Sequence, residues 1–268
     1  MHIYTLALDT TTDISSIAIT DGAEVLGEYN FLHRMDLSQR LMPSIVNLLK
    51  DCKLEMSDLR ALGVSLGPGS FTGLRIGVVT AKTLAQTLGI PIAGIVTLDL
   101  LAHQFNYLSG ALVCPLIKVR KGEVYYAFYR TTGCDIERLT EYEAGPVEDV
   151  VKVWECGSVG VWGNGSAEES GEGRMGEREP LDSSTPRLLA SSVLFCGDAL
   201  DANLPALTEA LGDGVIAAPQ WLSYPKASIL GRLAVEKIEA GESSDPFSLV
   251  PFYIRRSAPE MRMADACD

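Results

Sequence analysis

The sequence predicts an α/β protein built from two related lobes. Strand-like segments alternate with segments of helical periodicity along most of the 268 residues. A series of three strands followed by strand–helix alternation begins at residue 4, and a second such series begins at residue 111. A chain of this length can bury a large core in one or two domains.

The first half contains five expected strands and three expected helices. Apolar alternation marks the strands, Asp21-Gly22 is a hairpin signal, and Asp36 or Ser38 can cap the first helix. Pro43 should kink that helix or mark its first turn. The strands are expected at residues 4–9, 15–20, 24–31, 59–66 and 90–95, and the helices at about 36–52, 71–88 and 98–105.

The second half repeats the alternation with fewer clear signals. Lys121-Gly122 lies between two apolar runs and predicts a hairpin, and Pro225 suits the first turn of the last helix. Strands are expected at residues 111–119, 123–130 and 192–196, and helices at about 203–211 and 225–240.

Composition excludes several classes of protein. The formal charge of −13 argues against direct nucleic-acid binding, which needs clustered Lys and Arg, so a partner should hold any RNA. No apolar run is long enough to span a membrane, and the first residues are typical of a strand rather than a signal peptide. The six cysteines lie far apart without a Cys-x-x-Cys pair, as expected for reduced thiols in a cytoplasmic protein.

The segment Gly67-Pro68-Gly69-Ser70-Phe71-Thr72-Gly73-Leu74-Arg75 is the most informative part of the chain. It follows a buried strand and opens a helix, so it forms a glycine-rich turn at a helix N-terminus. Unsatisfied N–H groups and the helix dipole make such a turn a candidate phosphate site, and its small residues allow close backbone approach.

Other known motifs do not match this segment. No Gly-Lys-Ser/Thr closes it as in a P-loop, and its glycines are spaced G-x-G-x-x-x-G rather than as in the dinucleotide fingerprint. Residues 63–67 match G-x-S-x-G, but Ser65 lies inside the strand rather than at a sharp turn. A serine hydrolase is therefore disfavoured.

The chain resembles the bacterial TsaB (YeaZ) family over nearly its whole length except residues 155–190. The string G-P-G-S-F-T-G-L-R is specific to TsaB and its relatives. Further matching segments follow in the family's order, namely residues 6–11, 122–125, 195–198, 225–227 and 250–255.

This resemblance implies the two-lobed actin/hexokinase-like (ASKHA) fold with duplicated RNase H-like lobes. We expect an N-terminal lobe at 1–105, a C-terminal lobe at 106–223, a last helix at 225–240 packed back on the first lobe, and a tail at 241–268. Two positions depart from the family pattern: Leu37 replaces a usual His and Lys118 replaces a usual Asp, while Arg120 is retained.

The resemblance also implies a function. We expect a non-catalytic subunit of the complex that forms N6-threonylcarbamoyladenosine beside the anticodon of tRNAs. Its expected partners are a TsaD-type catalytic subunit and a TsaE-type ATPase, with a homodimer when alone and tRNA bound only indirectly. The alternative is a weak ATPase or a sugar-kinase-like phosphotransferase of the same fold.

No catalytic or metal site is expected. The TsaD paralogues bind metal through a His-x-x-x-His pair, whereas the histidines here are His2, His33 and His103, too far apart in sequence for such a pair. In actin-like folds an Asp ending the first strand holds Mg²⁺, and Asp9 has that placement. Local turn capping explains the same residues. ATP or ADP with Mg²⁺ is therefore possible, more readily in the complex, and the candidate residues are Asp9, Thr10, Thr11, Gly67, Gly69 and Ser70.

Two helices are expected to form an interface, and the alternative is that the same faces pack inside the protein, in an internal helix–helix contact or between the sheet and the last helix. Small residues recur every four positions on the second helix, which lets another helix approach closely. The first helix is apolar on more than one face, more than its own sheet requires. The interface residues are expected to be Leu41, Ile45, Leu48, Gly73, Gly77, Ala81 and Ala85. Residues 157–186, rich in Gly, Ser and Glu, are expected to be a disordered insertion.

Overall fold

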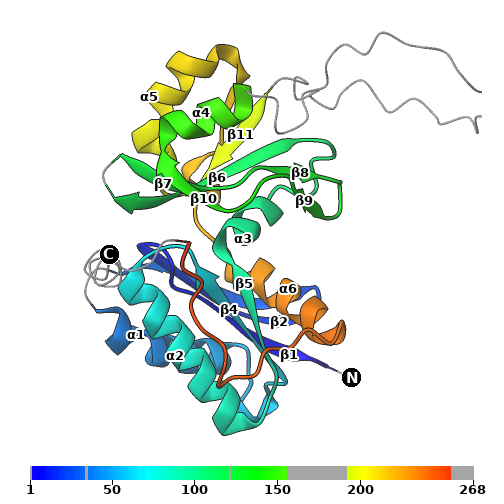
Figure 1. Ribbon diagram of the computed structural model, residues 1–268. Coiled ribbons are helices and arrows are strands. Elements are labelled where there is room, and N and C mark those ends of the chain that lie inside the picture. Colours follow the sequence, from blue (N-terminus) through cyan, green and yellow to red (C-terminus); the bar gives the residue numbers. More distant parts are fainter. Residues whose placement is uncertain (1, 34–35, 121, 156–191, 255–268) are drawn as a thin grey trace, which may run out of the picture.

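A computed structural model describes residues 2–33, 36–120, 122–155 and 192–254, and shows two α/β lobes stacked one above the other (Figure 1). The N-terminal lobe is built mainly from β1 (Tyr4–Asp9), β2 (Ile14–Asp21), β3 (Glu24–Leu32), α1 (Leu37–Asp51), β4 (Ala61–Gly67), α2 (Phe71–Leu88) and β5 (Ile92–Val96). These elements fall within a few residues of their predicted bounds, because apolar alternation is strong here.

The sheet of the N-terminal lobe has the order β3-β2-β1-β4-β5. The pairs β1–β2 and β2–β3 are antiparallel, whereas β1–β4 and β4–β5 are parallel. α1 and α2 cover one face, and α6 (Ala227–Glu239) covers the other. The last helix therefore packs on the sheet of the first lobe.

The C-terminal lobe has the same design. Its sheet has the order β10-β7-β6-β11-β12 and the same sequence of antiparallel and parallel pairs. This repetition confirms the expected duplication. The elements are β6 (Leu112–Arg120), β7 (Glu123–Tyr126), β8 (Tyr129–Thr131), β9 (Ile136–Arg138), β10 (Glu143–Pro146), α4 (Val147–Glu155), β11 (Val193–Cys196), α5 (Leu200–Leu211) and β12 (Val215–Ala217).

The helix α3 (Thr97–His103) lies between the lobes (Figure 1). Leu98 and Leu101 pack in a core cluster with β6 and β11 residues of the C-terminal lobe, whereas Leu100 packs with α6. α3 and α6 occupy corresponding places in the two halves of the chain, and each packs largely on the other half's sheet. Residue 105 therefore divides the sequence into two halves, but it does not divide the two packed lobes, because α3 precedes it and packs on the C-terminal lobe.

Several elements of the C-terminal lobe were not predicted. The expected strand 123–130 is two strands, β7 and β8, and the short strands β9, β10 and β12 and the helix α4 were missed. These strands have three or four residues each, too few for a clear period. The expected insertion at 157–186 lies outside the described residues. Single-turn 3₁₀ helices occur at Met56–Asp58, Gly212–Gly214 and Gln220–Leu222.

Candidate functional site

The ends of two strands of the N-terminal lobe and one strand of the C-terminal lobe lie near one another, since the charge of Asp198 acts on Asp9. β1 ends at Asp9 and β4 ends at Gly67, while β11 is followed directly by Gly197 and Asp198. Gly67 has φ +101° and Gly197 has φ +103°, a backbone conformation that favours glycine. The duplicated lobes thus turn from strand to helix in the same way.

Asp9 is fully buried and makes its hydrogen bonds locally. Its carboxylate accepts from the Thr11 N–H at 3.2 Å and from the Thr11 hydroxyl at 3.0 Å. Burial raises the pKa of Asp9 to about 6, and interactions with the Ser65 and Thr11 groups oppose that rise. Asp9 and Thr11 form an Asx turn, the local alternative to a metal-binding role.

The glycine-rich turn packs directly on the turn that follows Asp9. The Ser70 N–H donates to the Thr11 carbonyl at 2.7 Å, and the Thr10 hydroxyl donates to the Gly73 carbonyl at 2.8 Å. A Cβ atom at Gly69 would lie 2.3 Å from the Thr11 carbonyl oxygen. The two segments therefore touch, and no side chain larger than hydrogen fits between them.

This packing bears on the predicted phosphate residues. Asp9, Thr10 and Thr11 are at most 2% exposed, and the Ser70 N–H already has a protein acceptor. The Ser70 hydroxyl caps α2 by accepting from the Gly73 N–H at 3.3 Å. The structure brings all six predicted phosphate residues together. Ser70 is exposed, but a nucleotide would have to uncover Asp9, Thr10 and Thr11 to reach them.

Asp198 is a second carboxylate near Asp9, which the sequence interpretation did not assign to the site. It is exposed to solvent, and its carboxylate accepts from the Lys118 N–H at 2.9 Å. Crowding by protein atoms and the charge of Asp13 raise its pKa, while the Lys118 N–H and charge oppose that rise. The signal that could have found it is the glycine-aspartate pair after a buried strand, in the place that Gly67 takes in the other half.

The two positions that depart from the family pattern have different surroundings. Leu37 is 3% exposed and packs in the core of the N-terminal lobe, where an apolar side chain is favoured. Lys118 is exposed and adds a positive charge beside Asp198.

Neither His33 nor His103 belongs to a metal cluster within the described ranges. His33 Nε2 lies 3.1 Å from the Thr12 carbonyl oxygen and holds that turn. His103 Nε2 lies 3.7 Å from an Asp135 carboxylate oxygen. Burial lowers the pKa of His103, and the Asp135 charge opposes that effect. Both contacts are structural.

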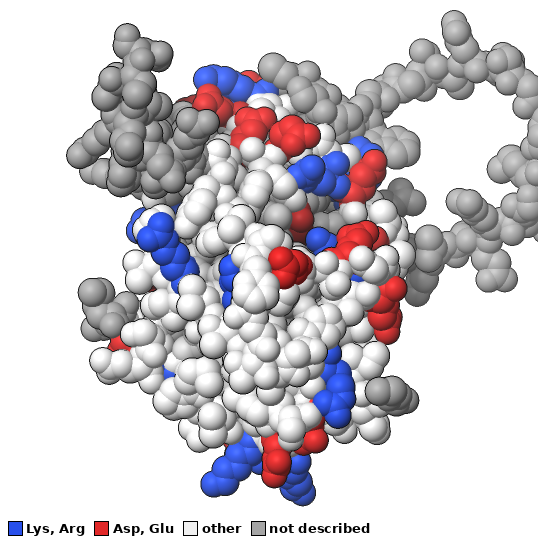
Figure 2. Space-filling view, turned by 60° about the horizontal axis from the view of Figure 1, so that its bottom comes forward, with Lys and Arg blue, Asp and Glu red and all other residues white. Residues whose placement is uncertain are grey.

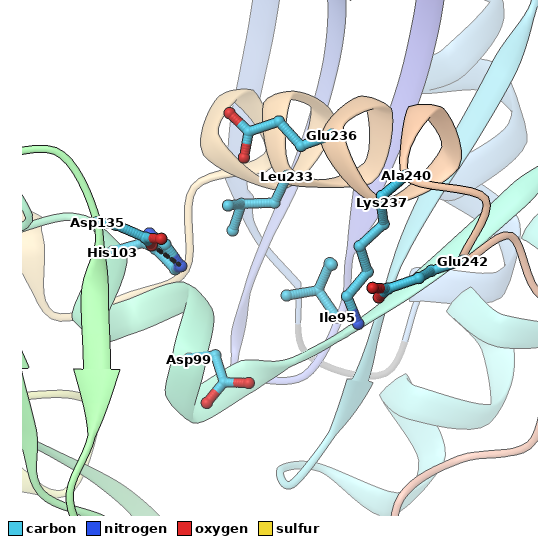
Figure 3. A pocket seen from close by; sticks show the side chains of 9 residues that line it. All are labelled: Ile95, Asp99, His103, Asp135, Leu233, Glu236, Lys237, Ala240 and Glu242. Atoms are coloured by element: carbon cyan, nitrogen blue, oxygen red, sulfur yellow. Dashed lines mark ion pairs between the residues drawn. The ribbon is translucent and has the colours of Figure 1, made fainter.

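A separate pocket of about 260 Å³ lies beside α3 and α6 (Figure 3). Asp99 and the His103–Asp135 pair line one side, and Glu236, Lys237 and Glu242 line the other. Lys237 Nζ also donates to the Gly94 carbonyl at 3.5 Å. The pocket is acidic and lies at the α3–α6 side of the lobe junction.

The predicted interface residues are buried inside the N-terminal lobe, so their assignment to a surface is wrong. Ala81 is 0% exposed, and a Cβ at Gly77 would lie 2.1 Å from the Thr10 hydroxyl oxygen. The small residues let α2 approach its own lobe's turn and sheet. All seven residues are buried, namely Leu41, Ile45, Leu48, Gly73, Gly77, Ala81 and Ala85.

The opposite faces of the same two helices are exposed and partly apolar. On α1, Met42 and Val46 are 38% and 52% exposed and lie one turn apart. On α2, Phe71 and Val79 are 45% and 61% exposed. α1 and α2 are neighbours on the same side of the sheet, and the exposed apolar residues of the two helices are called here the α1–α2 face. Figure 2 brings the lower end of this lobe forward and shows uncharged residues across the middle and most charged residues near the edge.

No helix within the described ranges combines the length and apolar character needed to cross a bilayer. The architecture itself, two lobes with the same five-strand order and helices on both sheet faces, defines a two-lobed actin/hexokinase-like (ASKHA) protein.

Comparisons with known proteins narrow this class. The sequence model of the TsaD family, tRNA N6-adenosine threonylcarbamoyltransferase, matches residues 33–262. The tRNA threonylcarbamoyladenosine biosynthesis protein TsaB of Bacillus subtilis is 30% identical over 97% of this chain and 98% of its own length. Its Escherichia coli counterpart is 36% identical over 52% of this chain and 60% of its own.

A solved structure supports the same grouping at the level of the fold. YeaZ from Pseudomonas aeruginosa aligns with a TM-score of 0.68 and 22% identity, covering 94% of this chain and all of that one. The chain belongs to the TsaB (YeaZ) family, within the wider TsaD family.

Proposed function

We propose that the chain is a non-catalytic subunit in the formation of N6-threonylcarbamoyladenosine on tRNA, and that it binds a TsaD-type catalytic subunit through the α1–α2 face. The observation that carries this proposal is the exposure of Met42, Val46, Phe71 and Val79 on two adjacent helices of a TsaB-family chain. Contiguous exposed apolar side chains on neighbouring elements are typical of protein interfaces.

The face has the character of a helix-bundle contact. Met42 and Val46 lie one helical turn apart on the same side of α1. Val79 lies on the outward side of α2, opposite the buried stripe of Gly73, Gly77, Ala81 and Ala85. Arg75 covers the Phe71 ring at 3.8 Å, so the face combines apolar and cationic groups. The interface is therefore proposed on the same helices as predicted, but on their opposite sides. The same face is proposed to pair two copies of the chain when no partner is present.

A structural role is favoured over a catalytic one by the burial and internal hydrogen bonds of the residues around Asp9. Asp9 is buried and hydrogen-bonded to Thr11, and the nearby Ser70 N–H is occupied. The formal charge of −13 disfavours direct binding of tRNA, so tRNA and a TsaE-type ATPase would join through the catalytic subunit.

The competing function is a weak ATPase or a phosphotransferase. It is favoured by Asp9 and Asp198, two carboxylates close enough for the charge of Asp198 to raise the pKa of Asp9. Magnesium and ATP would then bind between the lobes, with Asp9 and Asp198 as candidate carboxylates. ATP turnover by the isolated chain that disappears in Asp9→Ala, with native-like melting, would support this function instead.

The proposal is tested by Val79→Arg with calorimetric titration into a TsaD-type protein. If the α1–α2 face is the interface, a charge at this position should weaken binding by about 30-fold or more. Ala206→Arg, at an exposed position on α5 of the other lobe, is the matched control and should bind normally. Light scattering should show that Val79→Arg also weakens self-association and that Ala206→Arg does not. Normal binding by a folded Val79→Arg variant places the interface elsewhere.

A further inference from the structure

A segment that follows the last helix contacts both lobes. α6 ends at Glu239, and residues 244–254, called here the C-terminal strap, run along α2 toward the other lobe (Figure 1). Ser244 donates its N–H to the Ile92 carbonyl at 2.8 Å, and Leu249 is buried in the core beneath α1 and α2. The N-terminal lobe thus holds the first part of the strap.

Lys82 of α2 fastens the middle of the strap. Its Nζ donates to the carbonyls of Leu249 at 2.8 Å and Phe247 at 3.3 Å. Further along, the Phe252 N–H donates to the Leu66 carbonyl at 2.7 Å, next to the end of β4. These bonds satisfy strap backbone groups and fix its register against α2 and β4.

The far end of the strap enters the C-terminal lobe. The Phe252 ring lies edge-on to the Tyr142 ring with centroids 5.3 Å apart, and Ile254 packs against the core cluster that includes Leu98 and Phe105. The Tyr142 hydroxyl donates to the Asp99 carboxylate of α3 at 2.8 Å. Phe252 therefore touches the residue that anchors α3 to this lobe.

We propose that the C-terminal strap is an interlobe tie that restricts rotation of the two lobes relative to each other. In the described residues the backbone otherwise passes between the two sheets only twice, from β5 through α3 to β6 and from β12 to α6. Two lobes joined by short crossings can rotate as rigid bodies. A third connection, anchored by Leu249 in one core and Ile254 in the other, restricts that rotation. The inference does not depend on the proposed function.

Hydrogen exchange on the full chain, with no partner added, tests the tie. Phe252→Ala removes the aromatic contact, and backbone amides of residues 129–142 and of α3 should then exchange about tenfold faster, since such a pair is worth roughly one factor of ten. Val250→Ala, at a strap side chain that is 65% exposed, is the control and should leave these amides unchanged.

Two outcomes would overturn the inference. Unchanged exchange in the C-terminal lobe of Phe252→Ala means that the strap does not restrain it. Faster exchange confined to the N-terminal lobe means that the strap belongs to that lobe alone. If Phe252→Ala does not fold, Phe252→Leu keeps apolar bulk but lacks the ring, and it should still accelerate exchange at residues 129–142.

Discussion

Replacing Gly77 with alanine tests how closely α2 approaches its own lobe. A Cβ at Gly77 would lie 2.1 Å from the Thr10 hydroxyl oxygen and 3.3 Å from the Thr10 Cβ. Thr10 is 2% exposed, and its hydroxyl donates to the Gly73 carbonyl at 2.8 Å. The new methyl group must therefore displace the Thr10 side chain and break that bond.

The net cost follows from three contributions. Overpacking of a closed site costs about 1–3 kcal/mol, and loss of the buried hydrogen bond costs about 1 kcal/mol more. Alanine is better than glycine inside a helix by about 1 kcal/mol, which offsets part of the loss. We expect a destabilisation of about 2 kcal/mol, or a fall in melting temperature of about 4–8 °C for a chain of this size.

A double-mutant cycle with Thr10→Ala isolates this contact. Thr10→Ala removes the hydroxyl that the new methyl group would meet, so Gly77→Ala should cost about 1–2 kcal/mol less in that background. Urea unfolding gives the four free energies. Thr83→Ala, at an exposed α2 position, controls for helix propensity and should change stability little. Additive effects in the cycle, or a stabilised Gly77→Ala variant, would refute the close approach of α2 to the Thr10 turn.

Two further predictions follow from burial. Ala81→Arg, at a position with 0% exposure, should lower the free energy of unfolding by more than about 3 kcal/mol. Val79→Arg, at 61% exposure, should stay within about 0.5 kcal/mol of the parent. Thermal melting measures both, and a stable Ala81→Arg monomer would contradict the buried stripe. Burial raises the pKa of Asp9 to about 6, so the folded state holds a proton that the unfolded chain releases near pH 4, and stability from this group falls as pH rises between these values. Asp9→Asn should therefore gain on the parent across that interval, by up to about 3 kcal/mol at neutral pH, and a pH-independent difference in urea unfolding would contradict it.

The sequence predicted the N-terminal lobe better than the C-terminal lobe for a physical reason. β1 and α2 have long, regular patterns, and both were placed at their observed bounds. β9 and β12 have three residues each, too few to show a period. Their positions depend on pairing with β8 and β11, which is tertiary information.

The α2 stripe shows what periodicity does and does not determine. Glycine and alanine every four residues indicate that something approaches closely along that face. Whether it is another subunit or the protein's own turn depends on where residues 10–12 lie, which the helix sequence does not encode. A second apolar row containing Val79 was visible in the sequence. Only the structure shows which of the two rows points outward.

The two duplicated turns, taken together, explain why a phosphate-like motif need not bind phosphate. In the N-terminal lobe the Ser70 N–H at the start of α2 donates to the Thr11 carbonyl at 2.7 Å. In the C-terminal lobe the Ala199 N–H at the start of α5 donates to the Leu116 carbonyl at 3.1 Å, where a Cβ at Gly197 would lie 2.1 Å from the same oxygen. In each lobe a glycine allows a backbone carbonyl to reach the N-terminus of a helix. This carbonyl comes from the lobe's first strand or from the turn after it, and it accepts from one of the backbone N–H groups that an anion would use. An anion would have to displace these internal bonds. The glycine-rich turns are therefore explained by joining strand to helix within each lobe.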